Sequence, residues 1–186
     1  MFKSFTTEVV VLLKNGAIGV IPTDTVYGVV TPLFQESSVA RIYTLKGRDQ
    51  NKPVGTILIS DPLQISRVTD QDSLTKAQQY WPGPVSVVLP VSHELSYSHK
   101  GLNSLAFRIP NDQALQNLVA KTGPLATSSA NPAGQQPANT IEEAQSYFGN
   151  EVDFYVDGGD LSYSKASKIV RFDEQGNTEV IRGETK

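Results

Sequence analysis

The 186-residue sequence contains no cysteine and only two histidines. The lack of cysteine excludes a disulfide framework, a thiolate zinc site and a cysteine nucleophile. A transition-metal site built by the protein is not expected either, because the chain has only His93 and His99, no cysteine and no cluster of carboxylates at ligand spacing. Both histidines lie in the segment 92–101, and the polar composition of this segment predicts a loop.

Long apolar runs and an excess of positive charge are missing as well. The apolar runs are far shorter than the ~20 residues that a membrane-spanning helix needs, and no signal peptide is visible. We therefore expect no membrane association and a cytoplasmic location. Sixteen Lys and Arg against nineteen Asp and Glu give a net charge of −3. This balance is unlike that of a protein that holds nucleic acid through phosphates alone, so an RNA partner would need a local basic patch.

The length and the absence of linkers and repeats predict one domain over residues 1–186. Apolar periodicity and capping residues predict helices at about 6–16, 37–46, 70–80, 112–121 and from 140 onward. The same patterns predict strands at 17–21, 54–59, 85–91, 104–109, 124–128, 152–156, 168–172 and 178–181. Because strands and helices alternate first and strands then follow one another, the predicted fold class is α/β, with a mixed sheet and flanking helices.

Polar and basic residues gather where predicted strands and helices end, which is where α/β proteins place ligand sites. Four segments carry them: 22–28 (PTDTVYG), 46–53 (KGRDQNKP), 104–108 (SLAFR) and 127–131 (TSSAN). These segments, rather than a phosphate-binding glycine loop or a nucleophile elbow, hold the available chemistry, because neither of those motifs occurs.

Each segment also has an ordinary structural interpretation. Lys46 and Arg48 can cap the negative end of a helix, an effect worth at most about 1 kcal/mol. Arg108 can pair with a surface carboxylate on the solvated face of its strand. The serines and Asn131 in the last segment can be turn residues, because their side chains bond the neighbouring backbone.

Taken together and in order, these segments and the Trp81-Pro82-Gly83-Pro84 motif resemble the YrdC/TsaC family of L-threonylcarbamoyladenylate synthases. The resemblance covers about residues 7–182 and is to the short, single-domain members. It implies an open twisted α/β sheet with a concave, positively lined cavity. It also implies the reaction of ATP, L-threonine and bicarbonate to threonylcarbamoyl-AMP and pyrophosphate, which precedes threonylcarbamoyl-adenosine formation next to the anticodon of tRNA.

The resemblance also implies roles for single residues. The residues expected at the reaction are Lys46 and Arg48, and those at threonine are Thr25, Arg108, Thr127 and Ser167. The residues expected at the nucleotide are Arg48, Lys52, Ser104, Ser129, Asn131 and Arg182. Mg²⁺ is expected with ATP, bridging phosphate oxygens, without a metal site built by the protein. The other partners expected are weakly bound tRNA and downstream threonylcarbamoyl-transfer proteins.

Some points stay open at this stage. Tyr27 is either a wall of the threonine pocket or a core residue. Residues 167–171 read Ser-Lys-Ile-Val-Arg, where the family often has Ser-Thr-Ile-Val-Asp. The alternative function is a non-catalytic RNA-binding paralogue with the same fold. The carbamoyl-transfer domain of hydrogenase maturation proteins shares motifs, but its companion zinc-finger and acylphosphatase-like segments are not found here.

Overall fold

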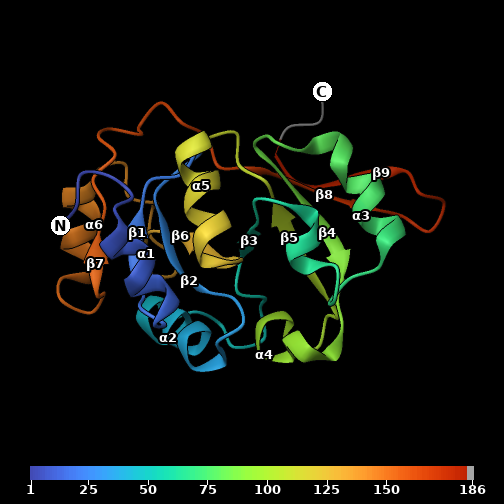
Figure 1. Cartoon of the computed structure of the whole chain (residues 1–186), viewed down its shortest axis with the longest axis horizontal. Coiled ribbons are helices and arrows are strands. Elements are labelled where there is room, and N and C mark those ends of the chain that lie inside the picture. Colours follow the sequence, from blue (N-terminus) through green and yellow to red (C-terminus); the bar gives the residue numbers. More distant parts are fainter. Residues whose placement is uncertain (184–186) are drawn as a thin grey trace.

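One mixed sheet organises the computed structural model, which describes residues 1–183 (Figure 1). The strands are β1 (Gly19–Ile21), β2 (Gly28–Pro32), β3 (Thr56–Leu58), β4 (Val85–Pro90), β5 (Ser104–Arg108), β6 (Leu125–Ser129), β7 (Phe154–Tyr155), β8 (Lys168–Phe172) and β9 (Thr178–Arg182). The helices are α1 (Thr7–Lys14), α2 (Glu36–Lys46), α3 (Gln71–Ala77), α4 (Ser96–His99), α5 (Gln113–Thr122) and α6 (Ile141–Phe148). Three short 3₁₀ helices are η1 (Pro62–Ile65), η2 (Gln78–Tyr80) and η3 (His93–Leu95).

The strand order is β7-β1-β2-β6-β3-β5-β4-β8-β9. Of the eight pairs in this part of the chain, five are antiparallel and three are parallel, which confirms the predicted mixed sheet. Strand β2 was not predicted, because its sequence Gly-Val-Val-Thr-Pro begins with glycine and ends with proline, and both residues are unfavourable within strands. It forms because β1 and β6 pair with it on both sides.

Alternating side chains of the strands build two apolar layers, one on each face of the sheet. On one face, α1 and α5 pack through Leu13 and Leu118 against a layer that contains Ile21 and Leu58. On the other face, the buried residues of α2 and α6 join the cluster that contains Val20 and Ile57. Neighbouring residues of a strand therefore face opposite layers. This explains why the strands are apolar at consecutive positions, since both faces of the sheet are covered.

The helices leave part of the first face open. Thr127, Thr56, Ala106, Val88 and Arg171 are successive cross-strand partners on β6, β3, β5, β4 and β8. Cross-strand partners share a face of the sheet, and so do residues two apart on one strand. Leu58 and Leu125 lie two residues from Thr56 and Thr127 and pack under α1 and α5, so the row lies on that same face. The open row forms the floor of the site described below.

The predicted loop at 92–101 is wrong. This segment forms η3 and α4, and Leu95, Ser98 and His99 are buried in it. Tertiary contact overrides the polar composition, because the Tyr43 hydroxyl of α2 donates hydrogen bonds to the Lys52 and Ser98 carbonyls. None of the helices in the described part of the chain is long and apolar enough to cross a membrane.

Candidate functional site

A cavity of about 510 Å³ lies over the open part of the sheet. Within residues 1–183, the charged side chains that line it are all arginines: Arg48, Arg108, Arg171 and Arg182. Hydroxyl side chains of threonine and serine make up most of the remaining polar lining. Cations gathered in a concave, partly desolvated site concentrate anions from solution. The cavity is therefore suited to a ligand with several negative groups.

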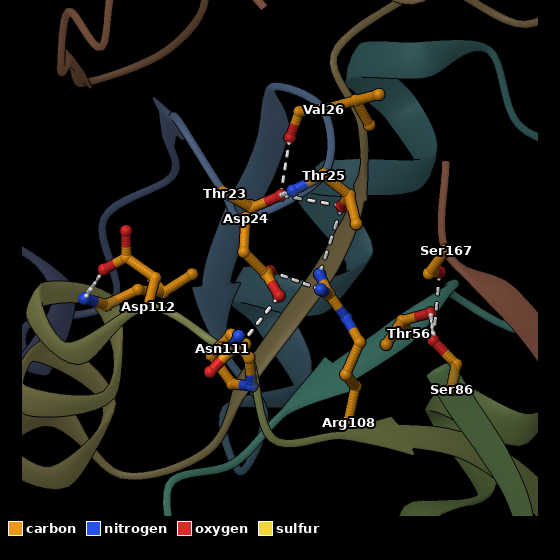
Figure 2. Close-up of polar contacts among 12 residues, drawn as sticks. Thr23, Asp24, Thr25, Val26, Thr56, Ser86, Arg108, Asn111, Asp112 and Ser167 are labelled. Atoms are coloured by element: carbon orange, nitrogen blue, oxygen red, sulfur yellow. Dashed lines mark hydrogen bonds and ion pairs between the residues drawn. The ribbon is translucent and has the colours of Figure 1, made fainter. Parts of the chain in front are cut away.

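Arg108 rises from the end of β5 toward the loop between β1 and β2 (Figure 2). It is only 3% exposed, and its Nη1 donates to the carboxylate of Asp24 while its Nη2 donates to Thr25 Oγ1 at 3.3 Å. The second oxygen of Asp24 accepts the Asn111 backbone N–H at 2.9 Å, which fixes the carboxylate. The surface ion pair considered from the sequence is therefore wrong: this pair is buried, because the 23–26 loop folds over β5.

The Nε of Arg108 is buried and has no hydrogen-bond partner in the described part of the chain. A buried guanidinium N–H without an acceptor is costly, so this edge of the side chain is suited to an anion in the cavity. Burial lowers the pKa of Arg108, and Asp24 acts in the opposite direction. Arginine stays charged at neutral pH under such shifts, so the side chain presents a fixed positive charge.

A row of three hydroxyl groups lies beside Arg108 (Figure 2): Thr56 and Ser167 at its ends line the cavity, and Ser86 between them is buried. Thr56 Oγ1 lies 3.2 Å from Ser86 Oγ, which in turn lies 3.1 Å from Ser167 Oγ. Arg182 extends the row, because its Nη2 donates to the Ser167 carbonyl at 2.9 Å and to Ser167 Oγ at 3.2 Å. Burial and the positive charge of Arg108 both lower the pKa of Arg182. Two arginines that repel each other in this way are stabilised by an anion between them.

Arg48 reaches the cavity because α2 stops just before it. Gly47 takes the left-handed conformation (φ 58°) that ends the helix, and Arg48 then donates from Nε and Nη2 to the Pro53 carbonyl at 3.0 and 2.7 Å. The loop passes directly over β6 at Gly55 (φ 143°), where a Cβ atom would lie 2.2 Å from the Thr127 carbonyl oxygen. Only glycine fits this crossing, which brings the loop to the cavity wall.

Lys46 does not line the cavity. Its ammonium group is buried beneath the turn after β6, where it donates to the Ser129 carbonyl, to the Asn131 carbonyl at 2.6 Å and to Asn131 Oδ1 at 3.3 Å. The Lys46 carbonyl accepts the Ala133 N–H at 2.7 Å, so both ends of the residue hold this turn. Burial, with a smaller contribution from Arg48, lowers the pKa of Lys46 to about 7.

The structure brings most of the sequence-predicted site residues together. Those that line the cavity are Thr25, Arg48, Ser104, Arg108, Thr127, Ser129, Ser167 and Arg182. Those outside its lining are Lys46, Lys52 and Asn131. Asn131 is buried beside Lys46, and Lys52 is exposed on the loop after α2. The motifs at 46–48 and 129–131 thus meet in space twice, through the hydrogen bonds of Lys46 and at the cavity wall, which Arg48 and Ser129 both line.

Arg171 and Tyr27 also line the cavity, although the sequence analysis did not assign either of them to the site. Arg171 was noted only as a departure from the family pattern, yet alternation along β8 places it on the cavity face, two residues from Ile169 and four from Ser167. Its Nε donates to Glu179 on β9 at 2.7 Å. Of the two roles left open for Tyr27, the structure shows the core one, because the side chain is fully buried in the core cluster; it also lines the cavity.

Among residues 1–183 there is no group of three or more His, Cys, Asp or Glu side chains that could hold a metal ion. The cavity lining in the same range contains no carboxylate at all. Carboxylates are the usual protein ligands of Mg²⁺.

Comparison with known proteins agrees with this geometry. The model of the Sua5/YciO/YrdC family, described as telomere recombination, matches residues 11–183. The threonylcarbamoyl-AMP synthase of Pseudomonas entomophila is 31% identical over 175 residues, which cover 91% of this chain and 92% of that protein. The human threonylcarbamoyl-AMP synthase is also 31% identical, over 183 residues that cover 91% of this chain and 63% of that one.

A solved structure extends the similarity to the fold. The Sua5 protein of P. abyssi, determined in complex with L-threonine, superposes with a TM-score of 0.85 and 26% identity. The match covers 94% of this chain and 52% of that protein, so this chain spans about half the length of that Sua5. The matched sequence pattern, the shared sheet and the arginine-lined cavity lead to one assignment: the chain belongs to the Sua5/YciO/YrdC family.

Proposed function

We propose that this protein is a threonylcarbamoyl-AMP synthase, which converts ATP, L-threonine and bicarbonate into threonylcarbamoyl-AMP and pyrophosphate. Relatives about 30% identical over most of the chain carry this name, and the similar Sua5 structure is a complex with L-threonine. The product is an activated carbamoyl donor, so the next reaction is its transfer to an adenosine of tRNA by other proteins.

The observation that carries the proposal is the state of Arg108. Asp24 holds its Nη1, while Nε is buried without an acceptor. Nε and Nη2 form one edge of the guanidinium fork, and a carboxylate binds such an edge through two parallel hydrogen bonds. The carboxylate of threonine fits this edge, with the hydroxyls of Thr25, Thr127 and Ser167 lining the same cavity.

The chemistry requires charge stabilisation and orientation rather than a protein nucleophile. The amine of threonine combines with bicarbonate to give a carbamate and water. A carbamate oxygen then attacks the α-phosphorus of ATP, the bond to the β-phosphate oxygen breaks, and pyrophosphate leaves. Arginines that face the phosphates neutralise the charge of this transition state, and a fixed cavity holds the reactants in line.

Arg48 and Arg182 are the cations that we assign to the nucleotide, and Ser104 and Ser129 are the hydroxyl donors beside it. We assign Lys46 and Asn131 to support of the turn that carries Ser129, because their side chains bond each other and that turn. Mg²⁺ enters in this proposal as MgATP. Its oxygen ligands come from the phosphates, because the described lining offers no carboxylate.

The RNA-binding alternative has less support. The relatives are named as synthases, and four arginines line a cavity rather than forming an outer patch, while the net charge is −3. Binding of tRNA, if present, is expected to be weak and to fall steeply with salt.

The test is to measure pyrophosphate release with MgATP while threonine and bicarbonate are added singly and together. Release is expected only with both, since neither alone supplies the attacking carbamate, and labelled threonine should appear in threonylcarbamoyl-AMP. The variant Arg67→Lys serves as a control, because Arg67 forms an exposed ion pair with Glu94 outside the cavity. Equal release with ATP alone would show simple hydrolysis of ATP to AMP and pyrophosphate and would refute the proposal.

A further inference from the structure

The segment between α4 and β5 forms a rim of the cavity with an unusual backbone. Lys100, Gly101 and Asn103 all have positive φ angles, of 52°, 86° and 52°. Two of these residues are not glycine, and such residues rarely adopt this conformation unless surrounding contacts impose it. We call residues 100–103 the rim loop. Leu102, at its centre, lines the cavity and is 59% exposed.

The contacts that impose this conformation come from His99. Its Nδ1 accepts the backbone N–H groups of Gly101 and Asn103, at 3.1 and 3.2 Å. The ring is 1% exposed, and burial lowers its pKa, as does the nearby His93 to a smaller extent. A ring nitrogen that accepts two N–H groups carries no proton, so the imidazole is neutral. His99 is therefore the centre around which the rim loop turns, and the chemistry proposed above gives it no role.

The rim loop presents an apolar group in a polar cavity. Leu102 is one of two lining residues that are large, apolar and substantially exposed within residues 1–183, and the other is Ile181 (49%), next to Arg182 on β9. Exposed apolar side chains inside a ligand cavity are stabilised by an apolar surface of the ligand. ATP offers such a surface only on its base, because its triphosphate and ribose are polar.

We propose that Leu102 packs on the base of the bound nucleotide and that His99 is a positioning residue, which places Leu102 there by holding the rim loop. The proposal rests on the proposed function for the identity of the nucleotide. It gives the cavity two parts: arginines and hydroxyls for the anionic groups, and an apolar contact for the ring. Loss of the contact should weaken ATP binding without changing the binding of the phosphate chain alone.

The test compares His99→Leu with His99→Asn. The Oδ1 of asparagine lies close to the position of Nδ1 and keeps a hydrogen-bond acceptor, whereas leucine has a similar size and no acceptor. A further pair is Leu102→Ala and Leu63→Ala, since both leucines are exposed and only Leu102 lines the cavity. Binding of MgATP and of inorganic tripolyphosphate is measured by calorimetry, so the result does not depend on turnover.

We expect His99→Leu and Leu102→Ala to raise the Kd of ATP by about tenfold, as expected for the loss of one good contact of ~1.4 kcal/mol. The Kd of tripolyphosphate should stay unchanged, and His99→Asn and Leu63→Ala should bind ATP like the parent. The proposal is overturned if Leu102→Ala binds ATP normally, if both ligands weaken equally, or if His99→Asn is as impaired as His99→Leu. A parent chain that binds ATP but makes no threonylcarbamoyl-AMP would refute the proposed function and leave this inference standing.

Discussion

Arg108 combines a fixed and an unpaired donor in one side chain. Asp24 fixes its Nη1 from within the protein, and its Nε has no acceptor among the described residues. The variant Arg108→Lys keeps the charge and can still pair with Asp24, but it loses the planar fork. Threonine binding should therefore weaken by about 1–3 kcal/mol, while ATP binding stays nearly unchanged.

Isothermal titration with each ligand measures this, with Arg67→Lys as the control for an exposed arginine outside the cavity. A variant that binds threonine like the parent would refute the assignment of Arg108 to the threonine carboxylate.

Lys46 shows how burial changes the expected effect of a mutation. As a cation that only offsets a helix dipole, it would contribute at most about 1 kcal/mol to stability. In the structure its ammonium bonds three oxygens of the turn at 129–131. The variant Lys46→Met keeps the aliphatic stem but leaves buried acceptors unpaired, so the free energy of unfolding should fall by about 2–4 kcal/mol.

Urea unfolding tests this, with Lys14→Met as the matched control. Lys14 is an exposed lysine in the last turn of α1, and its loss should change stability by less than about 0.5 kcal/mol. Equal, small effects of the two variants would contradict the supporting role of Lys46.

At the scale of elements, an ion pair connects α2 to the β7 edge of the sheet. Arg41 on α2 donates to both oxygens of Asp153 at 2.8 and 3.0 Å, and the Ile18 backbone N–H donates to the same carboxylate at 2.7 Å. The hydrogen bond from Arg41, opposed by burial and supported by Ile18, holds the pKa of Asp153 below its usual value. The contact therefore stabilises the fold when the carboxylate is ionised.

Asp153→Asn should lower the free energy of unfolding by about 1 kcal/mol at pH 7, a modest figure because both partners are over one-third exposed and solvent screens them. A depressed carboxyl pKa gives stability that is present above about pH 4 and is lost as the pH falls further. The difference between parent and variant should thus shrink in urea unfolding as the pH falls below about 4. Glu174→Gln, in an exposed turn, is the control, and a difference that stays constant with pH would contradict the linkage.

Helix ends were predictable from the sequence because the interactions there are local. Thr6, Asp70, Asp112 and Thr140 accept the backbone N–H groups of the first turns of α1, α3, α5 and α6. Thr140 and Glu143 have the spacing of a capping box, and the structure forms one half of it. Thr140 Oγ1 accepts the Glu143 N–H, but the Glu143 carboxylate accepts the Asn139 N–H instead of that of Thr140. The buried turn at η3 and α4 was missed, because its stability comes from α2, more than 50 residues earlier in the chain.

At the scale of the whole molecule, the arrangement of the sheet decides where charge gathers. Strands β7, β8 and β9 are close in sequence, yet β7 pairs at one edge of the sheet and β8–β9 at the other (Figure 1). The segment between them carries Ser167 to the cavity and is followed by Arg171 on β8. A chain with a net charge of −3 thereby acquires a cavity whose charged lining, in the described residues, is entirely positive.

The sequence by itself determined the class of fold, most of the elements and the segments that meet at the cavity, since periodicity, caps and turns depend on residues close together in the chain. Only the tertiary structure decided the strand order, the pairing of Arg108 with Asp24 across 84 positions and the burial of Lys46 beneath a turn 83 positions away. The physical reason is that burial and the loss of water around a charge arise from packing between distant segments. A basic residue in a motif therefore gives the same sequence pattern whether it lines a cavity, as Arg48 does, or supports a turn, as Lys46 does.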